Sequence, residues 1–402
     1  MIKVSKDKKK IEELLTRGVQ NIYPSKEWLK KALQAGEKLK VYIGIDPTAA
    51  TLHIGNAITL IKLKAFQELG HKVIFLIGSF TGMIGDPTGK AETRKPLSRK
   101  QVLENAKKYK AQAGKFLKFA GENAAEVVFN HQWLDKLTLK DLAEIGVNIT
   151  ARRLLERDMF QKRDKKGEPI YFTELMYPLL QGYDSVAMAV DGEIGGNDQT
   201  FNMLVGRDLL KKISGKEKFV LTMKLLIDPT GKKMGKSEGN MISFEDDYRE
   251  MFGKIMSWGD EMTATGLELV TEMKTEEIEK MTKAVKAGKI NPKEAKMRLA
   301  KEVTAIYHGT KKAAEAVIEW KKVFSKREIP EKMEEVKLDR PQRDLVWLIV
   351  KINKTSKSNA WRLIKQGGVK IDGEKGEVNT QLTGGEIIKV GRKNKYIKIK
   401  SL

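Results

Sequence analysis

Two short apolar runs on either side of a helical pattern constrain the fold of this chain more than any other feature. Residues 40–45 (KVYIGI) and 71–77 (HKVIFLI) are almost continuously apolar, and residues 56–69 between them follow a helical period that stops at Gly70. Strands of this kind, alternating with helices, are typical of a parallel sheet covered on both faces. We therefore predict an α/β domain, with further strands near residues 126–130 and 219–227.

Beyond this domain, the pattern of predicted secondary structure changes twice. After residue 240, amphipathic helices follow one another without a convincing strand, and two of them meet near Gly309. Residues 326–340 are charged and contain Pro330, which is typical of a linker. We predict an α/β domain with N-terminal helices at 1–240, including an inserted segment at about 120–180, then an α-helical domain at 241–325, a linker at 326–340 and a small α+β domain at 341–402.

The net charge indicates a class of binding partner, and the absence of cysteine excludes certain kinds of site. The net charge is +23, and residues 341–402 alone hold 14 lysines and arginines against 5 acidic residues. Solubility explains part of this excess, but so large a charge also favours a nucleic-acid partner. The absence of cysteine excludes disulfides and thiolate metal sites, and no apolar run is long enough to cross a membrane. We expect a cytoplasmic protein with no membrane association and no protein-bound metal or organic cofactor.

Two segments far apart in the chain are suited to phosphate. Residues 46–56 (DPTAATLHIGN) join a strand to a helix, whose free N–H groups and dipole favour an anion, although a histidine in such a turn is often only structural. Residues 231–237 (GKKMGKS) place lysines on a glycine-containing loop that could neutralise a triphosphate, with a solvated basic turn as the alternative. A Walker loop is excluded, because it needs four residues between its glycines and this loop has three.

Two other segments carry polar groups suited to a small ligand. If Thr173 caps a helix, Tyr177, Gln181 and Asp184 lie on one face of it. That stripe fits a ligand pocket better than solvent, and an exposed polar face is the alternative. Residues 195–199 (GGNDQ) follow an apolar run, and the carboxylate of Asp198 suits ribose hydroxyls, although Gly-Gly-Asn is also common in turns.

Taken in order, these segments resemble the class I aminoacyl-tRNA synthetases. HIGN at 53–56 is similar to their HIGH signature, and KMGKS at 233–237 to KMSKS. The bacterial tyrosyl members are indicated by YIGIDPT at 42–48, IGDPTGK at 84–90 and YPLLQGYD at 177–184. Residues 359–370 (NAWRLIKQGGVK) resemble a small RNA-binding domain that is shared with a ribosomal protein. The resemblance spans nearly the whole chain and implies a Rossmann-like catalytic domain, a helical anticodon domain and a homodimer formed through the inserted segment.

The resemblance also implies an activity and a role for each matching residue. Tyrosine is expected to react with ATP, accompanied by Mg²⁺, and then to be transferred to tRNA(Tyr). The substrate's phenol is expected at Tyr42 and Asp184, and its ammonium group at Asp86, Tyr177 and Gln181. The remaining matches fall into two groups. Those expected along the adenylate are Gly44, Asp46, Gly55, Gly196, Asp198 (at the ribose) and Gln199 (on the tyrosine side). Those expected around the phosphates are Thr48, His53, Asn56, Lys233, Lys236, Lys90 and Arg94.

Three residues depart from the family pattern. Asn56 replaces the second histidine of HIGH, Gly235 replaces the serine of KMSKS, and Asn197 stands where threonine or serine is usual. An asparagine still donates a hydrogen bond without being protonated, whereas a glycine removes a hydroxyl and loosens its loop. Catalysis is expected to survive, with an altered rate.

Two other functions share part of this pattern. HIGN also occurs among tryptophanyl enzymes, but Tyr42 and Asp184 favour tyrosine because indole offers no matching hydroxyl. An RNA-binding protein derived from a synthetase, without catalysis, would share the charge and the C-terminal domain. Such a protein could lose His53, Asp198 and the loop lysines, and all of these are present.

Overall fold

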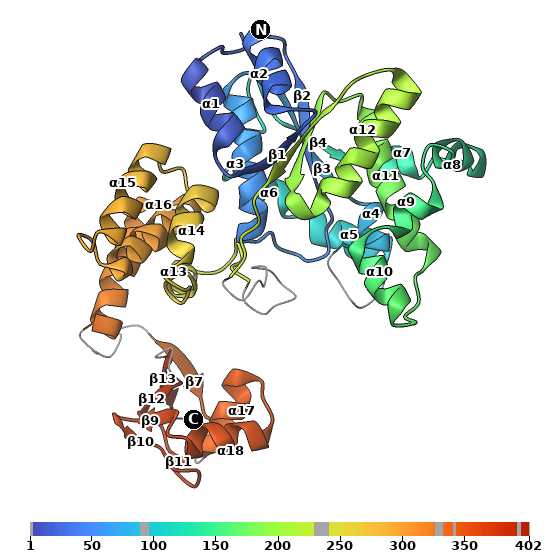
Figure 1. Ribbon diagram of the computed structural model, residues 1–402. Helices are drawn as coiled ribbons and strands as arrows, with labels where there is room; N and C mark the ends of the chain where they lie inside the picture. Colours follow the sequence, from blue (N-terminus) through green and yellow to red (C-terminus); the bar gives the residue numbers. More distant parts are fainter. Residues whose placement is uncertain are drawn as a thin grey trace. The chain divides into compact units, whose positions relative to one another are not determined.

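The computed structural model describes residues 3–88, 96–228, 241–325, 333–340, 343–391 and 395–401. The chain divides into two compact units, Met1–Ala313 and Ala314–Leu402, and each is described by itself (Figure 1). No helix in the described part is long and apolar enough to span a membrane.

The first unit is built on a six-stranded sheet with the order β1-β6-β5-β2-β3-β4. Its strands are β1 (Val19–Tyr23), β2 (Lys40–Ile45), β3 (Lys72–Ile77), β4 (Glu126–Phe129), β5 (Gly192–Gly196) and β6 (Phe219–Met223). Five of them are parallel, as predicted, and the apolar β3 is buried along nearly its whole length. The antiparallel edge strand β1 was not predicted, because its sequence VQNIY lacks a continuous apolar run.

Helices cover both faces of this sheet. Figure 1 shows α1 (Lys8–Thr16), α2 (Lys26–Ala35) and α3 (Ile54–Glu68) on one side, and α11 (Phe172–Met188) and α12 (Thr200–Ser214) on the other. Shorter helices complete the unit, namely α4 (Thr81–Ile84), α5 (Arg99–Ala106), α6 (Tyr109–Ala113), α7 (His131–Leu134), α8 (Leu139–Gly146), α9 (Ala151–Leu155) and α10 (Asp158–Lys165). The helices between β4 and β5 occupy most of the segment expected as an insertion, whereas β4 itself belongs to the sheet.

Local capping decides where these helices begin. A capping box of Ser98 and Gln101 begins α5. The predicted cap at Thr173 is wrong, because α11 begins two residues earlier, after Tyr171. The Glu174 carboxylate accepts the Tyr171 backbone N–H at 2.9 Å, and that bond starts the helix without a hydroxyl cap. Tyr177, Gln181 and Asp184 nevertheless lie on this helix, as expected.

Strand order places a ligand crevice between β2 and β5. The chain runs from β2 outward to β3 and β4, and it then returns to the other side of β2 to form β5 and β6. In open parallel sheets, ligands bind at the carboxyl ends of the two strands where the order reverses in this way. The turn that carries HIGN follows β2, and the GGNDQ segment overlaps the end of β5.

A helical region completes the first unit and extends into the second. It consists of α13 (Tyr248–Met256), α14 (Met262–Val270), α15 (Thr275–Lys286) and α16 (Pro292–Ser325). Gly309 interrupts α16 with φ 82° and ψ 161°, so the prediction of two helices meeting there is confirmed. Such a positive φ is readily adopted only by glycine.

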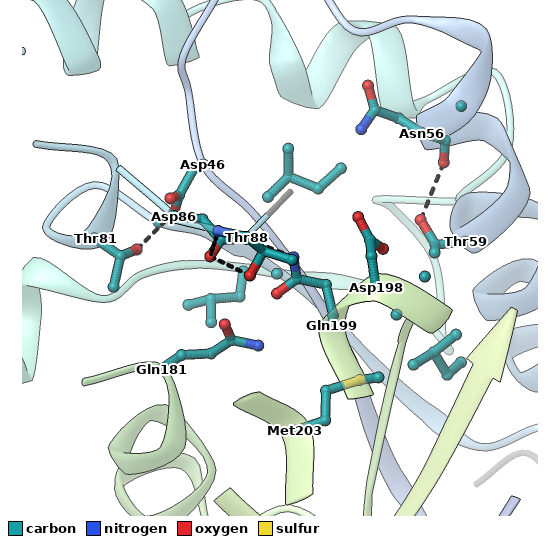
Figure 2. Close-up of a pocket in the computed structure, with 18 of the residues that line it drawn as sticks. Asp46, Asn56, Thr59, Thr81, Asp86, Thr88, Gln181, Asp198, Gln199 and Met203 are labelled. Carbon is teal, nitrogen blue, oxygen red and sulfur yellow. Dashed lines mark hydrogen bonds between the residues drawn. The ribbon is translucent and has the colours of Figure 1, made fainter. Parts of the chain in front are cut away.

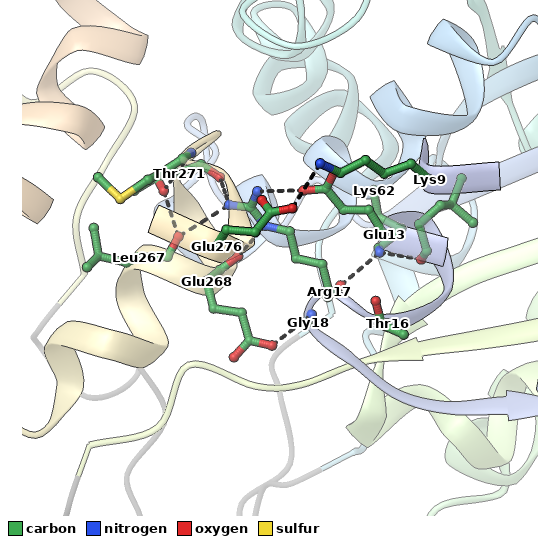
Figure 3. A network of polar contacts seen from close by, with 12 residues as sticks. Lys9, Glu13, Thr16, Arg17, Gly18, Lys62, Leu267, Glu268, Thr271 and Glu276 are labelled. Carbon is green, nitrogen blue, oxygen red and sulfur yellow. Dashed lines mark hydrogen bonds and ion pairs between the residues drawn. The ribbon is translucent and has the colours of Figure 1, made fainter. Parts of the chain in front are cut away.

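Arg17, just after α1, connects the helical region to the α/β part of the first unit through hydrogen bonds. Its guanidinium donates to the carbonyl oxygens of Leu267 (3.3 Å), Glu268 (3.0 Å) and Thr271 (2.6 Å) at the C-terminal end of α14 (Figure 3). The last carbonyls of a helix have no partner within the helix, so this cation satisfies groups that would otherwise need water.

The Glu268 side chain adds a second connection at the same place. It accepts the Gly18 backbone N–H at 2.9 Å and the Lys224 ammonium at 2.9 and 3.2 Å. Lys224 directly follows β6, so α14 is linked to the end of a sheet strand as well as to α1.

The second unit contains a small α+β domain. Its five-stranded sheet has the order β10-β9-β12-β13-β7, and two strands, β8 (Arg343–Asp344) and β11 (Gln381–Leu382), pair separately. The sheet consists of β7 (Glu334–Lys337), β9 (Val369–Ile371), β10 (Glu374–Lys375), β12 (Ile387–Val390) and β13 (Lys395–Lys400), with helices α17 (Leu345–Asn353) and α18 (Lys357–Lys365). Strand β7 falls within the segment predicted as a linker and pairs in parallel with β13. The sequence EEVK contains a single apolar residue, so nothing in it indicated a strand.

Candidate active site

A cavity of about 740 Å³ lies at the predicted crevice. Figure 2 shows Asp86 and Gln199 close together in it, with Asn56 and Asp198 further along. Fourteen predicted site residues line this one cavity, namely Tyr42, Gly44, Asp46, Thr48, His53, Gly55, Asn56, Asp86, Tyr177, Gln181, Asp184, Gly196, Asp198 and Gln199. The other four, Lys90, Arg94, Lys233 and Lys236, lie outside the described residues.

His53 begins α3 and is held there by two bonds. Its Nδ1 accepts the Gly55 backbone N–H at 3.1 Å, and its own backbone N–H donates to Asn56 Oδ1 at 3.0 Å. Because Nδ1 is an acceptor, the ring carries its proton on Nε2. Burial lowers the pKa of His53 to about 4, so the ring is neutral near pH 7 and offers an N–H at the helix N-terminus. Asn56, the departure from HIGH, therefore has a role in capping this helix.

The described residues on either side of residues 229–240 reach the site. Leu226 lines the cavity just before residues 229–240, which are not described. Directly after them, Ser243 forms a β-bridge with His53, and the Ile54 backbone N–H donates to the Ile242 carbonyl at 2.9 Å. Lys224 also lines the cavity and was not predicted.

Asp46 is held at the middle of the cavity by two hydroxyl groups. Thr81 Oγ1 donates to one carboxylate oxygen at 2.6 Å, and the Tyr177 hydroxyl donates to the other at 2.8 Å. Burial and the nearby Asp46 charge raise the pKa of Tyr177, which keeps its proton available for this bond. A Cβ at Gly78 would meet Asp46 Oδ1 at 2.0 Å, so a side chain there would displace the carboxylate.

Asp86 lies beside this pair and is also fixed. Gln199 Nε2 donates to one oxygen at 2.5 Å, and the Thr88 backbone N–H and hydroxyl donate to the other at 3.0 and 2.7 Å. Arg157 in turn donates to the Thr88 hydroxyl at 2.6 Å, and its guanidinium lies over the Phe201 ring. Two carboxylates aimed into one space, Asp46 and Asp86, suit a cationic substrate group.

Asp184 lies at the closed end of the cavity and is 2% exposed. Trp133 Nε1 donates to one of its oxygens at 2.8 Å and Asn130 Nδ2 to the other at 3.3 Å. Burial raises the pKa of Asp184, and these two bonds oppose the shift because they favour the charged form. Tyr42, fully buried, lines the same cavity, and its hydroxyl lies 3.0 Å from Ser185 Oγ.

Several of these neighbours could not be found from sequence. Asn130 and Trp133 follow β4 and reach Asp184 only because β4 and α7 lie next to β3, as the strand order requires. Glu193 and Lys218 form a buried ion pair next to Tyr42, and Lys218 looked like an ordinary charged residue just before a strand. The pattern GEIGG, which places a carboxylate inside a buried strand, was the one available signal.

A helix N-terminus with a neutral histidine, the Asp198 carboxylate and the enclosed end at Asp184 share one crevice, and the comparisons assign this chain to the class I aminoacyl-tRNA synthetases. A family model described as "tRNA synthetases class I (W and Y)" matches residues 34–325. The chain is 42% identical to the Tyrosine--tRNA ligase of Moorella thermoacetica over 94% of this chain and 93% of that one. It is 45% identical to that of Aquifex aeolicus, over 95% and 97%.

A solved structure agrees with this assignment. The C-terminally truncated mitochondrial tyrosyl-tRNA synthetase of Coccidioides posadasii superposes with a TM-score of 0.64 at 25% identity, covering 77% of this chain and 91% of its own. The chain belongs to the tyrosine–tRNA ligase family.

Proposed function

We propose that this protein joins L-tyrosine to tRNA(Tyr) in the cytoplasm, first forming tyrosyl-adenylate from tyrosine and ATP. The observation that carries this proposal is the buried Asp184 beside Tyr42 at the closed end of a cavity whose other end is the His53 turn. A phenol at the closed end would donate to Asp184 and accept from Tyr42. Indole has no oxygen for Tyr42 to donate to, so the pocket favours tyrosine over tryptophan.

The first step requires positioning more than acid–base chemistry. The tyrosine carboxylate attacks the α-phosphorus of ATP, the bond from that phosphorus to the bridging oxygen breaks, and pyrophosphate leaves with the electron pair. Asp86, Tyr177 and Gln181 would hold the ammonium group, Asp46 would lie along the adenylate, and Asp198 would accept from the ribose. The N–H on Nε2 of His53, beside the N-terminus of α3, would stabilise charge on the departing phosphates.

Mg²⁺ would enter with ATP as part of the substrate. In the described part of the chain, no group of three or more histidines and carboxylates lies close enough together to hold a metal. Mg²⁺ commonly takes phosphate oxygens and water as most of its ligands, so the nucleotide would hold it. Lys233 and Lys236, with Lys90 and Arg94, would add positive charge around the pyrophosphate.

Exchange of labelled pyrophosphate into ATP tests this proposal directly. Exchange is expected with L-tyrosine and not with L-tryptophan. Exchange with tryptophan alone would reassign the substrate, and no exchange with any amino acid would favour the non-catalytic RNA-binding alternative.

The C-terminal domain supplies a surface suited to RNA. Trp361 on α18 is 44% exposed, and the Lys365 ammonium lies 4.8 Å from the centre of its ring. A shallow pocket there is lined by Lys357, Ser358, Trp361, Arg362, Lys365 and Gln366. Aromatic faces bordered by cations bind unpaired bases by stacking and phosphates by charge.

Removing residues 333–402 is expected to separate the two steps. Because β7 pairs with β13, the cut precedes β7 and removes the small domain whole. Pyrophosphate exchange should stay within about twofold, while tRNA charging weakens and its logarithmic dependence on salt becomes shallower, since fewer phosphates are neutralised. Trp361→Ala serves as a milder companion variant. Equal loss of both activities in the truncated protein would contradict this division of labour.

Exposed apolar side chains between β4 and β5 support a homodimer. Leu139, Val147 and Phe172 are 84%, 85% and 72% exposed, which is unusual for large apolar residues on one segment. The double change Val147→Glu/Phe172→Glu should shift the protein from dimer to monomer in sedimentation velocity. Ile318→Glu is the matched control, because Ile318 is also exposed (57%) but lies on α16. An unchanged sedimentation coefficient in the double variant would argue against this surface.

A further inference from the structure

A lysine with no access to solvent lies behind the end of the cavity that is proposed to bind the amino acid. Lys218, the residue before β6, is 0% exposed, and its ammonium donates to Glu193 Oε2 at 2.5 Å and to Ser185 Oγ at 2.7 Å. Taking two charges out of water is costly, and their mutual attraction often does no more than offset that cost. Gly206 on α12 leaves the room for them, since a Cβ there would lie 2.9 Å from Lys218 Nζ. Because such an ion pair contributes little to the free energy of folding, we expect it to have a functional role.

Each end of this ion pair is connected to a residue of the proposed tyrosine pocket, Glu193 directly and Lys218 through Ser185. Glu193 Oε1 accepts from Gln181 Nε2 at 3.2 Å. Ser185 Oγ lies 3.0 Å from the Tyr42 hydroxyl. Glu193 is therefore bonded directly to a group proposed for the substrate's ammonium, and Lys218 is connected through one residue, Ser185, to a group proposed for its phenol.

On the phenol side, the ion pair determines the direction of a hydrogen bond. An ammonium group has donors and no acceptor, so Ser185 Oγ must accept from Lys218. The Ser185 proton then has the Tyr42 oxygen as its partner, among the described residues. With Ser185 donating to it, Tyr42 keeps its own proton, and burial together with the neighbouring Glu193 and Asp184 carboxylates raises the pKa of Tyr42 so that the proton is retained.

On the ammonium side, the same pair orients an amide. The Glu193 carboxylate is an acceptor at both oxygens, one for Lys218 and one for the Gln181 NH₂ group. The carbonyl oxygen of Gln181 is then turned away from Glu193, and Gln181 lines the cavity. A carbonyl oxygen is the end of the amide that can accept from an ammonium group.

We propose that Lys218 and Glu193 are positioning residues for tyrosine activation. They set Tyr42 to donate to the substrate's phenol oxygen and Gln181 to accept from its ammonium group. Lys218 lies outside the cavity and Glu193 lines it, and both are proposed to act through Tyr42 and Gln181; the proposal rests on the tyrosine pocket described above.

The test compares a neutral double variant with controls. Lys218→Met/Glu193→Gln removes both charges while keeping similar volumes. The KM for tyrosine in pyrophosphate exchange should rise about tenfold, as expected for one or two weakened hydrogen bonds, and the preference for tyrosine over phenylalanine should fall. The KM for ATP should not change. Lys62→Met is the matched control, because Lys62 is also buried but, among the described residues, donates to the carbonyls of Leu14 and Arg17 alone, so the substrate preference should stay at the wild-type value.

Ser185→Ala keeps the proposal testable if the double variant does not fold. It removes the relay to Tyr42 without unpairing a charge, so it should weaken tyrosine binding and leave phenylalanine binding unchanged. A folded variant of either kind with wild-type KM for tyrosine and wild-type preference would overturn the proposal. Wild-type exchange with tyrosine is measured first: its absence would instead remove the proposed function.

Discussion

Replacing Asp184 with asparagine is expected to lower the enzyme's preference for tyrosine over phenylalanine roughly a hundredfold. Both Asp184 oxygens accept N–H groups, from Trp133 and Asn130, whereas an amide has one acceptor oxygen. The amide must therefore leave a buried donor unpaired or turn its NH₂ group toward one. Losing a hydrogen bond to a charged group costs about 3 kcal/mol, so kcat/KM for tyrosine should fall roughly a hundredfold. Phenylalanine, which makes no such bond, should be used as before.

Pyrophosphate exchange with each amino acid measures this preference. Tyrosyl enzymes as a class reject phenylalanine by about 10⁵, a value known for the class and not worked out from this cavity. Trp133→Phe is a useful companion variant, because it removes one donor to Asp184 and leaves the carboxylate. Its effect should be smaller than that of Asp184→Asn. An Asp184→Asn enzyme that keeps its preference would mean that the phenol is recognised elsewhere.

Replacing His53 with asparagine is expected to slow adenylate formation about 10²- to 10³-fold, the usual effect of removing one donor to charge that develops in a transition state. Asparagine is a preferred N-cap residue and can still accept the Gly55 N–H, so α3 should keep its start. The loss should therefore fall on kcat, with little change in the KM for tyrosine. Single-turnover formation of the adenylate, with the melting temperature as a check on folding, separates these effects.

Two controls sharpen the His53 experiment. His53→Ala should lose the donor and the cap together, which adds about 1 kcal/mol of instability. The pH profile of the wild type should show no ionisation of His53 near its ordinary pKa of about 6.5, because burial lowers this pKa to about 4. The ring is thus protonated only in acid below the working range. A step near pH 6.5 that disappears in His53→Asn would contradict the neutral role.

Much of the site followed from sequence because its residues lie at points where chain geometry is predictable. His53 and Asp198 lie at turns after parallel strands, and such turns meet at one edge of a sheet. Tyr177, Gln181 and Asp184 share a face through helical periodicity alone. No knowledge of tertiary contacts was needed for any of them.

The remainder depended on contacts that only the folded chain creates. Asn130 and Trp133 reach Asp184 across a sheet edge, and Lys218 is a charged residue whose complete burial no local pattern indicates. Strand β1 was missed because an edge strand needs few apolar residues, and β7 because its partner β13 lies at the far end of the small domain. Long-range pairing, rather than propensity, decided these elements.

The hydrogen bonds of Glu268 connect α14 to the cavity, so a movement of α14 would change the surroundings of a cavity residue. The same carboxylate holds a backbone N–H just after α1 and the ammonium of Lys224, which lines the cavity. If RNA shifted α14, Lys224 would lose its counter-ion and present an uncompensated positive charge to the nucleotide. A displacement of α14 on tRNA binding would then change the electrostatic potential next to the nucleotide.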